Sequence, residues 1–415
     1  MGILTDVRPL KESPAYRRLW FGLLVGNLGQ QMSVVAIAYE VYTITHSSFA
    51  VGLVGLAGLL PLIVGGLYGG ALADAFDRRT VAIASALGLW ASSLALVAHA
   101  LWGLSNVGIL YAIVALTSAM FAINQPARSS MLPRLLPPDL LPAANALGMA
   151  STNLGFTVGP LVGGLVIAWQ GPGAVYGIDA VLYLAALYAL FRLPPMPPLD
   201  DRAPAPGLRS VADGLRFLAT APNLRMTFIV DLCAMVLAQP RALFPALAIT
   251  VYASGAGALG VLQSAPAIGS LLAFAVSGWI SRVHRHGVAI VIAIGIYGMS
   301  VALVGVAAVG WPGLLMLAVV FLAFSGAADM VSAAYRSTML QVAAPDQMRG
   351  RMQGVFIVVV AGGPRLGDFV IGSLAAAVGE QRAMVIGGVA CVVGVLLAVW
   401  RSRQFLAYDD RQPTP

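Results

Sequence analysis

Apolar runs of about 20 residues recur along the whole chain, separated by short polar or glycine- and proline-containing stretches. A run of about 20 apolar residues is long enough to cross a bilayer as a helix. The runs lack the strict alternation of membrane-spanning β-strands. We therefore predict an all-α membrane protein with twelve transmembrane helices, at residues 19–44, 49–73, 80–102, 107–124, 141–169, 174–192, 224–252, 257–281, 288–309, 313–334, 352–378 and 383–400.

Basic residues gather at one set of helix ends. Of the 24 lysines and arginines, 21 fall on one side of the predicted spans, at or beyond their ends, while Arg382 falls in a predicted external turn and Arg241 and Arg365 lie deep within predicted spans. Because loops rich in lysine and arginine stay in the cytoplasm, this asymmetry predicts that both termini and the long middle loop are cytoplasmic. It also accounts for the net charge of +7 without nucleic acid as a partner.

Composition agrees with a membrane protein, since 59% of the residues are hydrophobic and 10% are charged, whereas soluble proteins carry about 25% charged residues. Cys233 and Cys391 fall inside apolar runs, so we interpret them as packing residues and expect no disulfide framework or metal site. The N-terminus is polar through Arg18, and the next apolar run is long enough to span. No cleavable signal peptide is therefore expected.

The two halves of the chain repeat each other at an offset of 208 residues. Residues 128–132 read Arg-Ser-Ser-Met-Leu, and residues 336–340 read Arg-Ser-Thr-Met-Leu. Glycines recur at the same offset, as Gly155, Gly159 and Gly164 and then as Gly363, Gly367 and Gly372. Two parallel repeats of six spans predict two pseudo-symmetric six-helix bundles with a transport pathway between them near the bilayer midplane.

The middle of the chain forms a linker between the halves. Residues 194–198 contain four prolines, and Asp200 and Asp201 follow, which indicates a stiff, solvated segment. Residues 208–218 predict a short amphipathic helix on the inner membrane surface. We assign residues 1–193 to an N-terminal bundle, 194–223 to the linker, and 224–415 to a C-terminal bundle with a cytoplasmic tail.

A glycine-rich run ends abruptly in charged residues between the second and third predicted spans. Arg78 and Arg79 cannot sit in hydrocarbon, so this loop is expected at the cytoplasmic surface. The sequence here resembles the major facilitator superfamily of transporters, whose signature loop reads roughly Gly-x-x-x-Asp-Arg-x-Gly-Arg-Arg. The chain supplies Gly70, Asp74, Arg78 and Arg79, and it departs from the signature at Ala75 and Asp77.

The resemblance implies the major facilitator fold and a gating role for this loop. In the family, the signature aspartate sits against the start of span eleven when the inner side is closed. A carboxylate at a helix N-terminus is favourable by about 0.3–1 kcal/mol. Asp74 is thus expected to latch onto residues 350–353, with Arg351 as a nearby countercharge.

Span five contains Gly155, Gly159, Pro160, Gly163 and Gly164. They fill every fixed position of Gly-x-x-x-Gly-Pro-x-x-Gly-Gly, and this resembles the antiporter motif of facilitator exporters. Small residues allow close helix contact, and a proline frees a carbonyl group and bends the helix. The resemblance implies export, whereas the alternative is that these residues only pack spans together.

Charges within spans cost about 2.5–3.5 kcal/mol each on insertion scales, so they are functional candidates by default. Arg365 and Asp368 lie deepest, three residues apart on one helix face. Such a pair can neutralise itself, and a structural ion pair is one interpretation. The other is that Asp368, tied to Arg365, exchanges a proton as the pathway alternates.

Four further acids and one further arginine lie within the predicted spans, namely Glu40, Asp179, Asp231, Asp329 and Arg241. Glu40 shares a face with small residues and is expected to point inward, as a coupling group or as a hydrated end residue. Asp231 and Asp329 can bind a proton or cation, or serve as hydrated inner-end residues, and Asp179 is expected to be structural. Arg241 needs a partner, for which Glu40 or Asp179 lies at a similar depth.

Candidates for the substrate pathway are Gln30, Gln31, Phe156, Met235, Arg241 and Phe324. The aromatic and methionine side chains among them suit helix packing equally well. Many facilitator relatives carry Gly-Asp in span one, where this chain has Gln30 and Gln31. Attention for proton coupling therefore shifts to Glu40 and to the acids of the second half.

The overall layout resembles the enterobactin exporter branch of the superfamily over nearly the full chain. The resemblance rests on residues 14–17, on the turn at residues 45–53, and most specifically on residues 241–248, Arg-Ala-Leu-Phe-Pro-Ala-Leu-Ala. It implies proton-driven export of a small amphipathic molecule, either a siderophore or a drug, across the bacterial cytoplasmic membrane, with a monomer sufficient for the mechanism. The alternative within this fold is an uptake transporter or a uniporter.

Other function classes find little support in the sequence. It contains no phosphate-binding loop, no nucleophile paired with a base and no histidine-rich cluster, so neither an enzyme nor a cofactor or metal site is expected. His46 and His99 are isolated, and His284 and His286 are expected to be solvated in a cytoplasmic loop. A nonconducting scaffold is the remaining alternative, which reconstituted flux would distinguish from a transporter.

Overall fold

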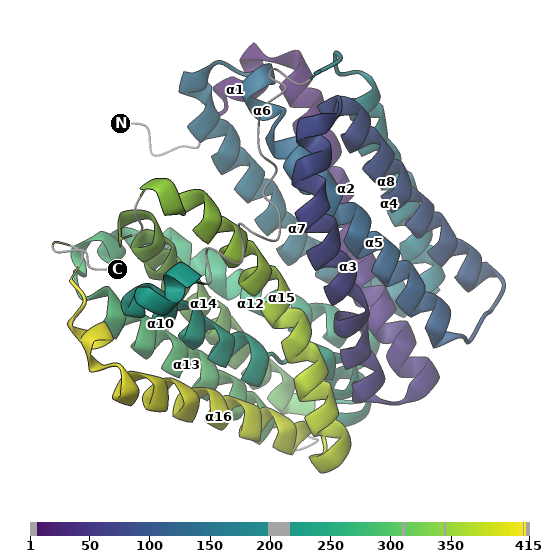
Figure 1. The fold of residues 1–415 in the computed structure, drawn as a ribbon. Coiled ribbons are helices and arrows are strands. Elements are labelled where there is room, and N and C mark those ends of the chain that lie inside the picture. Colours follow the sequence, from purple (N-terminus) through teal and green to yellow (C-terminus); the bar gives the residue numbers. More distant parts are fainter. Residues whose placement is uncertain (1–5, 198–215, 309–311, 344–345, 410, 412–415) are drawn as a thin grey trace. The chain divides into compact units, whose positions relative to one another are not determined.

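The computed structural model describes residues 6–197, 216–308, 312–343, 346–409 and 411, and within these it leaves undescribed the side chains of residues 71, 73, 74, 281, 312 and 346–358. The described chain is helical, with short connections and no strand (Figure 1). It divides into two compact units. Unit 1 comprises Met1–Ile44 and Ala57–Gly207, and unit 2 comprises Thr45–Leu56 and Leu208–Pro415.

Unit 1 contains the helices of the first half of the chain, with the first turns of α3 assigned to unit 2. Its elements are α1 (Arg8–Glu12), α2 (Pro14–Thr45), α3 (Ser48–Ala75), α4 (Arg78–Leu101), α5 (Val107–Ser129), α6 (Leu132–Leu135), η1 (Pro138–Leu140), α7 (Leu141–Gln170) and α8 (Pro172–Phe191). Helix α4 packs against both α5 and α8. The core includes Leu19, Ala86, Ala127 and Leu190. Small residues such as Ala86 let the helix axes approach closely.

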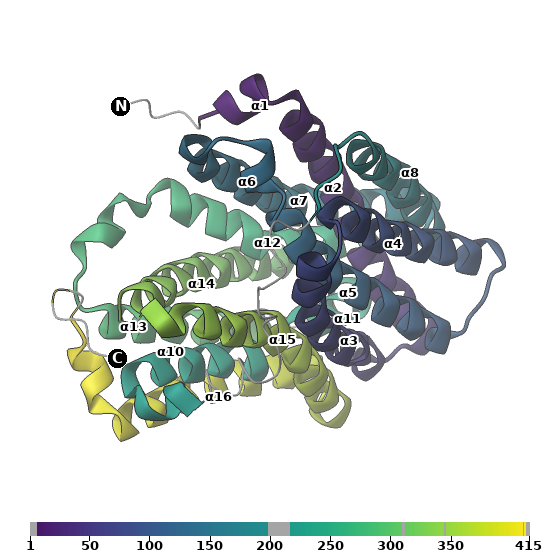
Figure 2. The ribbon, with the colours of Figure 1, turned by 45° about the horizontal axis from the view of Figure 1, so that its top comes forward.

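Unit 2 contains the helices of the second half. Its elements are α10 (Pro222–Leu232), η2 (Cys233–Leu237), η3 (Arg241–Leu243), α11 (Phe244–Ala246), η4 (Leu247–Val251), α12 (Gly255–Ala275), η5 (Ser277–Arg282), α13 (His286–Ala307), η6 (Pro312–Leu314), α14 (Leu315–Ala343), α15 (Asp346–Val378), α16 (Glu380–Arg401) and η7 (Arg403–Ala407). Helix α13 packs against α14 and α16 (Figure 2). Cys391 is buried and Cys233 half-buried, both as free thiols.

Eleven helices in the described part of the chain are long and apolar enough to cross a membrane, and each overlaps one of the predicted spans. The remaining predicted span, at residues 352–378, lies within the 33-residue helix α15. The prediction of an all-helical membrane fold is therefore confirmed.

The sequence repeat reappears in the structure. At the 208-residue offset, the starts of four helix pairs coincide, at Pro14 and Pro222, Arg78 and His286, Val107 and Leu315, and Pro172 and Glu380. Packing repeats as well. A Cβ added to Gly155 would meet Asn27 at 3.4 Å, and one added to Gly363 would meet Met235 at 3.2 Å. Since Asn27 and Met235 are also 208 residues apart, each half places its fifth span on the same turn of its first span.

The predicted span at residues 224–252 is present as Pro222–Val251, but its helix is interrupted in the middle. Helix α10 runs into a π-helical turn, Ala238 leaves helical geometry (φ −125°, ψ 22°), and only short 3-10, α- and π-helical turns follow. Pro240 lies directly before η3, and Pro245 lies within α11; proline lacks an amide hydrogen and its ring clashes with the preceding turn. The Tyr297 hydroxyl donates to the Ala238 carbonyl at 3.4 Å. This hydrogen bond gives a partner to one carbonyl group that the break leaves without a helical hydrogen bond.

The prediction that His286 is solvated is wrong. His286 is the first residue of α13, and its side chain is buried. Its ring lies 4.9 Å from the Tyr335 ring and 6.1 Å from the Tyr408 ring, measured between centroids. The segment η7 packs on α13, so residues close to the C-terminal end of the chain cover a position that appears to be a loop in the sequence alone.

Candidate functional site

The charged side chains of the spans gather into clusters inside each unit. In unit 2, Arg336 on α14 pairs with Asp231 on α10, with 2.5 Å between Nη1 and Oδ1. Its Nη2 lies 3.5 Å from Oδ1 of Asp329, and its Nε donates to the Ser332 hydroxyl at 3.1 Å. The guanidinium presents several donors in a fixed plane, so one arginine can bind both acids and tie α10 to α14.

Asp368 on α15 lies close to the interrupted span. The backbone N–H of Ala242 donates to its carboxylate, and Arg241 and Arg365 lie near enough to attract it electrostatically. Arg241 also attracts Asp329. The helix break frees amide donors at the start of η3, and one of them binds Asp368. Within this cluster, three carboxylates thus balance three guanidinium groups, those of Asp231, Asp329 and Asp368 and those of Arg241, Arg336 and Arg365.

In unit 1, no arginine is paired with Glu40, which lies beside tyrosine and histidine side chains among the described residues. Tyr176 donates its hydroxyl proton to Oε2 of Glu40 at 2.6 Å. Nδ1 of His99 approaches Oε1 of Glu40 to 3.1 Å, without the alignment of a hydrogen bond. All three side chains are buried. Tyr176 and His99 were not predicted as partners of Glu40, although a histidine in an apolar run was the available signal.

Asp179 on α8 is bound by neutral groups. Ser33 and Ser93 both donate to its Oδ2, at 2.9 and 2.8 Å. The residue also lines a cavity of about 60 Å³ together with Gln30, and its Oδ1 has no hydrogen-bond donor among the described atoms. The two acids expected as partners of Arg241 therefore have partners of their own in unit 1, while Arg241 attracts Asp368 and Asp329 in unit 2.

The residues of the signature loop bind the ends of neighbouring helices in unit 1. Arg79 donates to the Phe191 carbonyl at the end of α8 at 2.7 Å. Arg78 donates to the Ser130 carbonyl just after α5 at 3.3 Å. Cations at helix C-termini complement the helix dipole. Gly70 lies within α3. The Asp74 side chain and those of residues 350–353 lie outside the described residues, so the latch stays a prediction.

Asp77, where the family signature has glycine, has a structural explanation. Its Oδ1 accepts from the Thr80 amide at 3.0 Å and so caps the first turn of α4. Its Oδ2 accepts from the Met196 amide at 2.7 Å, and the Arg78 amide donates to the Met196 carbonyl at 3.2 Å. One carboxylate therefore starts α4 and fixes the chain that leaves α8.

The glycines of the antiporter motif face α2. A Cβ added to Gly159 would lie 2.6 Å from Cβ of Gln31, and one added to Gly163 would lie 3.1 Å from Cα of Met32. Pro160 and Gly164 are buried within the same helix. The motif therefore brings the backbone of α7 against α2, and whether it also acts in transport stays a prediction.

The other pathway candidates divide by their surroundings. Met235 packs against Gly363 and Gly367, which is a packing role. Phe156 and Phe324 expose 37% and 57% of their surface, so each has an open face that can contact lipid or substrate.

Comparisons with known proteins agree with this architecture. The enterobactin exporter EntS of Citrobacter koseri is 27% identical over 421 residues, covering 99% of this chain and 97% of the relative. That of Shigella boydii serotype 18 is 28% identical over 404 residues, covering 95% and 93%.

Solved structures match in fold at low identity. A mutant of the nucleoside transporter NupG aligns with a TM-score of 0.78 and 13% identity over 94% of this chain and 100% of that one. A POT family transporter in complex with 5-aminolevulinic acid aligns with a TM-score of 0.74 and 14% identity, covering 95% and 97%. The family model for transmembrane secretion effectors matches residues 5–412. The resemblance to major facilitators is thereby confirmed, and the chain belongs to the transmembrane secretion effector family of major facilitator transporters, as a multi-pass membrane protein and not an enzyme.

Proposed function

We propose that this transporter exports a small amphipathic molecule by alternating access, in exchange for protons. The observation that carries the proposal is the close backbone contact of α7 with α2 through Gly155, Gly159 and Gly163, at the motif that resembles those of facilitator antiporters. The likeness to enterobactin exporters over more than nine-tenths of the chain supports the outward direction. Uptake or uniport by the same fold is the competing function.

For the proton, we favour Asp368. Its carboxylate accepts from the Ala242 amide beside Arg241 and Arg365, at a break in the helix. A proton bound to this carboxylate removes its negative charge and weakens its attraction for both arginines. The interrupted segment between α10 and η4 can then rearrange. Glu40, Asp231 and Asp329 are the other coupling candidates, and each already has a specific partner.

For location and orientation, we propose the bacterial inner membrane with both termini in the cytoplasm. The bacterial origin of the relatives and the accumulation of arginines at one set of helix ends support this topology. The substrate class, a siderophore or a drug-like molecule, follows from resemblance alone. The proposed working unit is a monomer.

Proton flux in proteoliposomes of known orientation tests the proposal. Purified protein would be challenged with a panel of siderophores and cationic dyes while internal pH and substrate are both recorded. We expect substrate to move from the cytoplasmic side outward while protons move inward. Substrate flux with no proton movement would contradict the coupling, and flux in the same direction as protons would indicate uptake. Protein-free liposomes and an ionophore-collapsed gradient serve as controls.

A further inference from the structure

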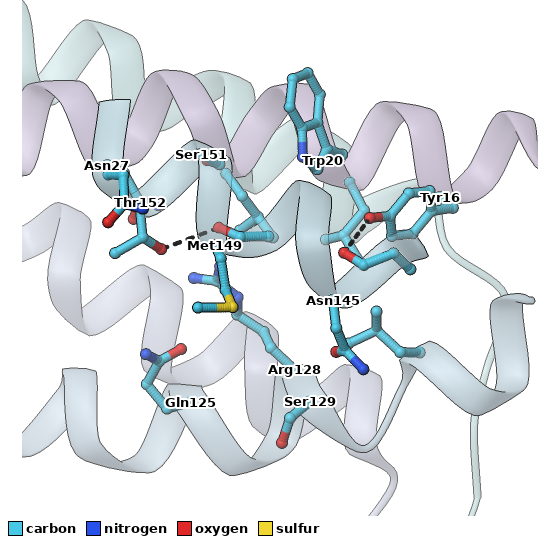
Figure 3. Close-up of a pocket in the computed structure, with 16 residues that line it drawn as sticks. Tyr16, Trp20, Asn27, Gln125, Arg128, Ser129, Asn145, Met149, Ser151 and Thr152 are labelled. Carbon is cyan, nitrogen blue, oxygen red and sulfur yellow. Dashed lines mark hydrogen bonds between the residues drawn. The ribbon is translucent and has the colours of Figure 1, made fainter. Parts of the chain in front are cut away.

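Unit 1 contains a cavity of about 380 Å³ between α2, α5 and the first half of α7. Its wall is rich in amide and hydroxyl side chains, including Asn27, Gln125, Ser129, Asn145 and Thr152. Figure 3 shows these groups around Arg128, which comes from the end of α5. Arg128 is the single charged residue among those lining the cavity.

Arg128 is incompletely satisfied within the described part of the protein. Its Nη1 donates to Asn124 at 3.2 Å, its Nε is buried without a hydrogen-bond partner, and no described carboxylate lies within ion-pairing distance. A guanidinium group without a countercharge is costly where water is scarce. The cavity beside it is therefore a place where an anion would be stabilised.

The second half of the chain contains acidic partners for the equivalent arginine that the first half lacks. Arg336 corresponds to Arg128 at the repeat offset, and the hydrogen bond to the residue four positions earlier is kept, to Ser332 in one half and Asn124 in the other. Arg336 also binds Asp231 and Asp329. The positions equivalent to these acids in the first half are Leu23 and Phe121. The first half therefore keeps the arginine and lacks both internal anions.

The aromatic wall of the cavity is fixed in place. Tyr16 donates its hydroxyl proton to the Ala144 carbonyl at 3.0 Å, and Nε1 of Trp20 donates to the Leu147 carbonyl at 2.9 Å. These bonds satisfy the polar atoms of both rings and leave their apolar surfaces as a rigid wall. Arg128, the amides and the rings together suit a ligand with an anionic group on an apolar or aromatic body.

We infer that this cavity binds organic anions, with Arg128 supplying the positive charge. The equivalent charge in the other half, on Arg336, is neutralised by Asp231 and Asp329. The inference rests on the proposed export function for its meaning, since under the proposed topology this end of unit 1 faces the cytoplasm and would receive the substrate. The chemical class is a carboxylate, phosphate or sulfonate carried on an apolar body.

Equilibrium binding to the full chain in phosphatidylcholine nanodiscs tests the inference. The probe is naphthoate, with neutral naphthamide as its matched control, measured by calorimetry. We expect naphthoate to bind and naphthamide to bind at least about tenfold more weakly, because a hydrogen-bonded charge contributes about 1.5–3 kcal/mol, or roughly tenfold to hundredfold in affinity. Arg128→Gln should lose this preference. Arg134→Gln should keep it, because Arg134 binds the Pro197 carbonyl and does not line the cavity.

A second pair of variants protects the test against misfolding. Leu23→Asp places a carboxylate where the other half has Asp231, so it should occupy Arg128 and abolish naphthoate binding while the protein stays folded. Leu23→Asn, which is polar and neutral, should bind naphthoate within about threefold of wild type, since it offers Arg128 no charge. Thermal unfolding confirms the fold of each variant.

Equal naphthoate binding by wild type and Arg128→Gln, or no naphthoate binding by wild type, overturns the inference. Displacement of naphthoate by added phosphatidylglycerol assigns the same charge recognition to a lipid headgroup, and unchanged binding assigns it to a soluble anion. Because binding is measured without a gradient, a failure of proton-coupled export leaves this result standing, and the reverse also holds.

Discussion

Arg336 on α14 and Asp231 on α10 form a buried ion pair with 2.5 Å between Nη1 and Oδ1. Their side chains expose only 7% and 4% of their surface. The partially exposed Asp329 joins the same guanidinium group at 3.5 Å. The pair therefore fixes α10 against α14, the helix that carries the repeated Arg-Ser-Thr-Met-Leu segment.

Removing one member of this pair should be strongly destabilising. Arg336→Gln leaves the Asp231 carboxylate buried without its countercharge, and such losses cost about 3–5 kcal/mol. We expect a clearly lower thermal unfolding midpoint for the purified protein. The double variant Arg336→Met with Asp231→Leu should regain much of that stability, because it leaves no charge uncompensated at this pair. Single and double variants of equal stability would show that the pair does not hold α10.

The contact between α7 and α2 predicts a different kind of defect. In Gly159→Ala, the added Cβ would lie 2.6 Å from Cβ of Gln31 and 3.2 Å from the Leu28 carbonyl oxygen, so the helices must separate. Overpacking of this kind costs about 1–3 kcal/mol, and we expect slower transport with it.

Gly66 on α3 provides the control for Gly159. Nothing lies within 4 Å of a Cβ added there, and alanine is favoured over glycine in a helix by about 1 kcal/mol. Gly66→Ala should therefore unfold at the same temperature as wild type or higher. If both variants behave alike in unfolding and in flux, close packing at Gly159 is not what the motif provides.

The long elements could be predicted from the sequence because their signals are strong and local. Apolar runs of membrane length predict the spans, and a fixed offset in the sequence predicts the repeat. The proline at position 240 is a visible sequence signal for the break in the helix. No sequence signal shows which group the freed backbone amides bind. Whether an amide released there binds Asp368 depends on how α15 is rotated about its axis, which no local pattern specifies.

Side-chain partners were predictable only where both members lie on one helix. Asp329, Ser332 and Arg336 share one face of α14, and that grouping appears in the structure. Glu40 instead meets Tyr176, 136 residues away in the chain. Such a contact depends on the packing of separate helices. The sequence therefore shows that a carboxylate lies within a span, which is energetically costly, but it does not predict which residue binds Glu40.

Asp77 gives a prediction about the signature loop. Asp77→Ala removes the cap of α4 and the bond to the Met196 amide. Loss of an N-cap costs about 1 kcal/mol, and a hydrogen bond to a charged group contributes about 1.5–3 kcal/mol. We expect a lower unfolding midpoint together with faster proteolysis of the chain that follows α8. Glycine at this position, as in the family signature, should restore most of the cap's contribution, because glycine at an N-cap costs only a few tenths of a kcal/mol. It should not restore the bond to the Met196 amide, for which it has no acceptor oxygen.

The last prediction separates two buried carboxylates with different surroundings. Asp368 accepts from the Ala242 amide and is attracted by Arg241 and Arg365, whereas Asp179 accepts from two serine hydroxyls. If Asp368 exchanges the proton, Asp368→Asn should abolish substrate-driven proton movement while substrate still binds, because the amide cannot take up and release a proton at this position. Asp179→Asn should keep proton movement, since its amide oxygen can still accept from Ser33 and Ser93.

Both variants would be compared with wild type in the same oriented proteoliposomes, with substrate binding measured separately so that an empty site is not mistaken for lost coupling. Normal proton movement in Asp368→Asn would exclude it as the coupling group. Loss of proton movement in Asp179→Asn alone would transfer that role to unit 1, where the small cavity lined by Asp179 and Gln30 has room on the order of a few water molecules. Such water could carry a proton to Oδ1 of Asp179, the oxygen that has no donor among the described atoms.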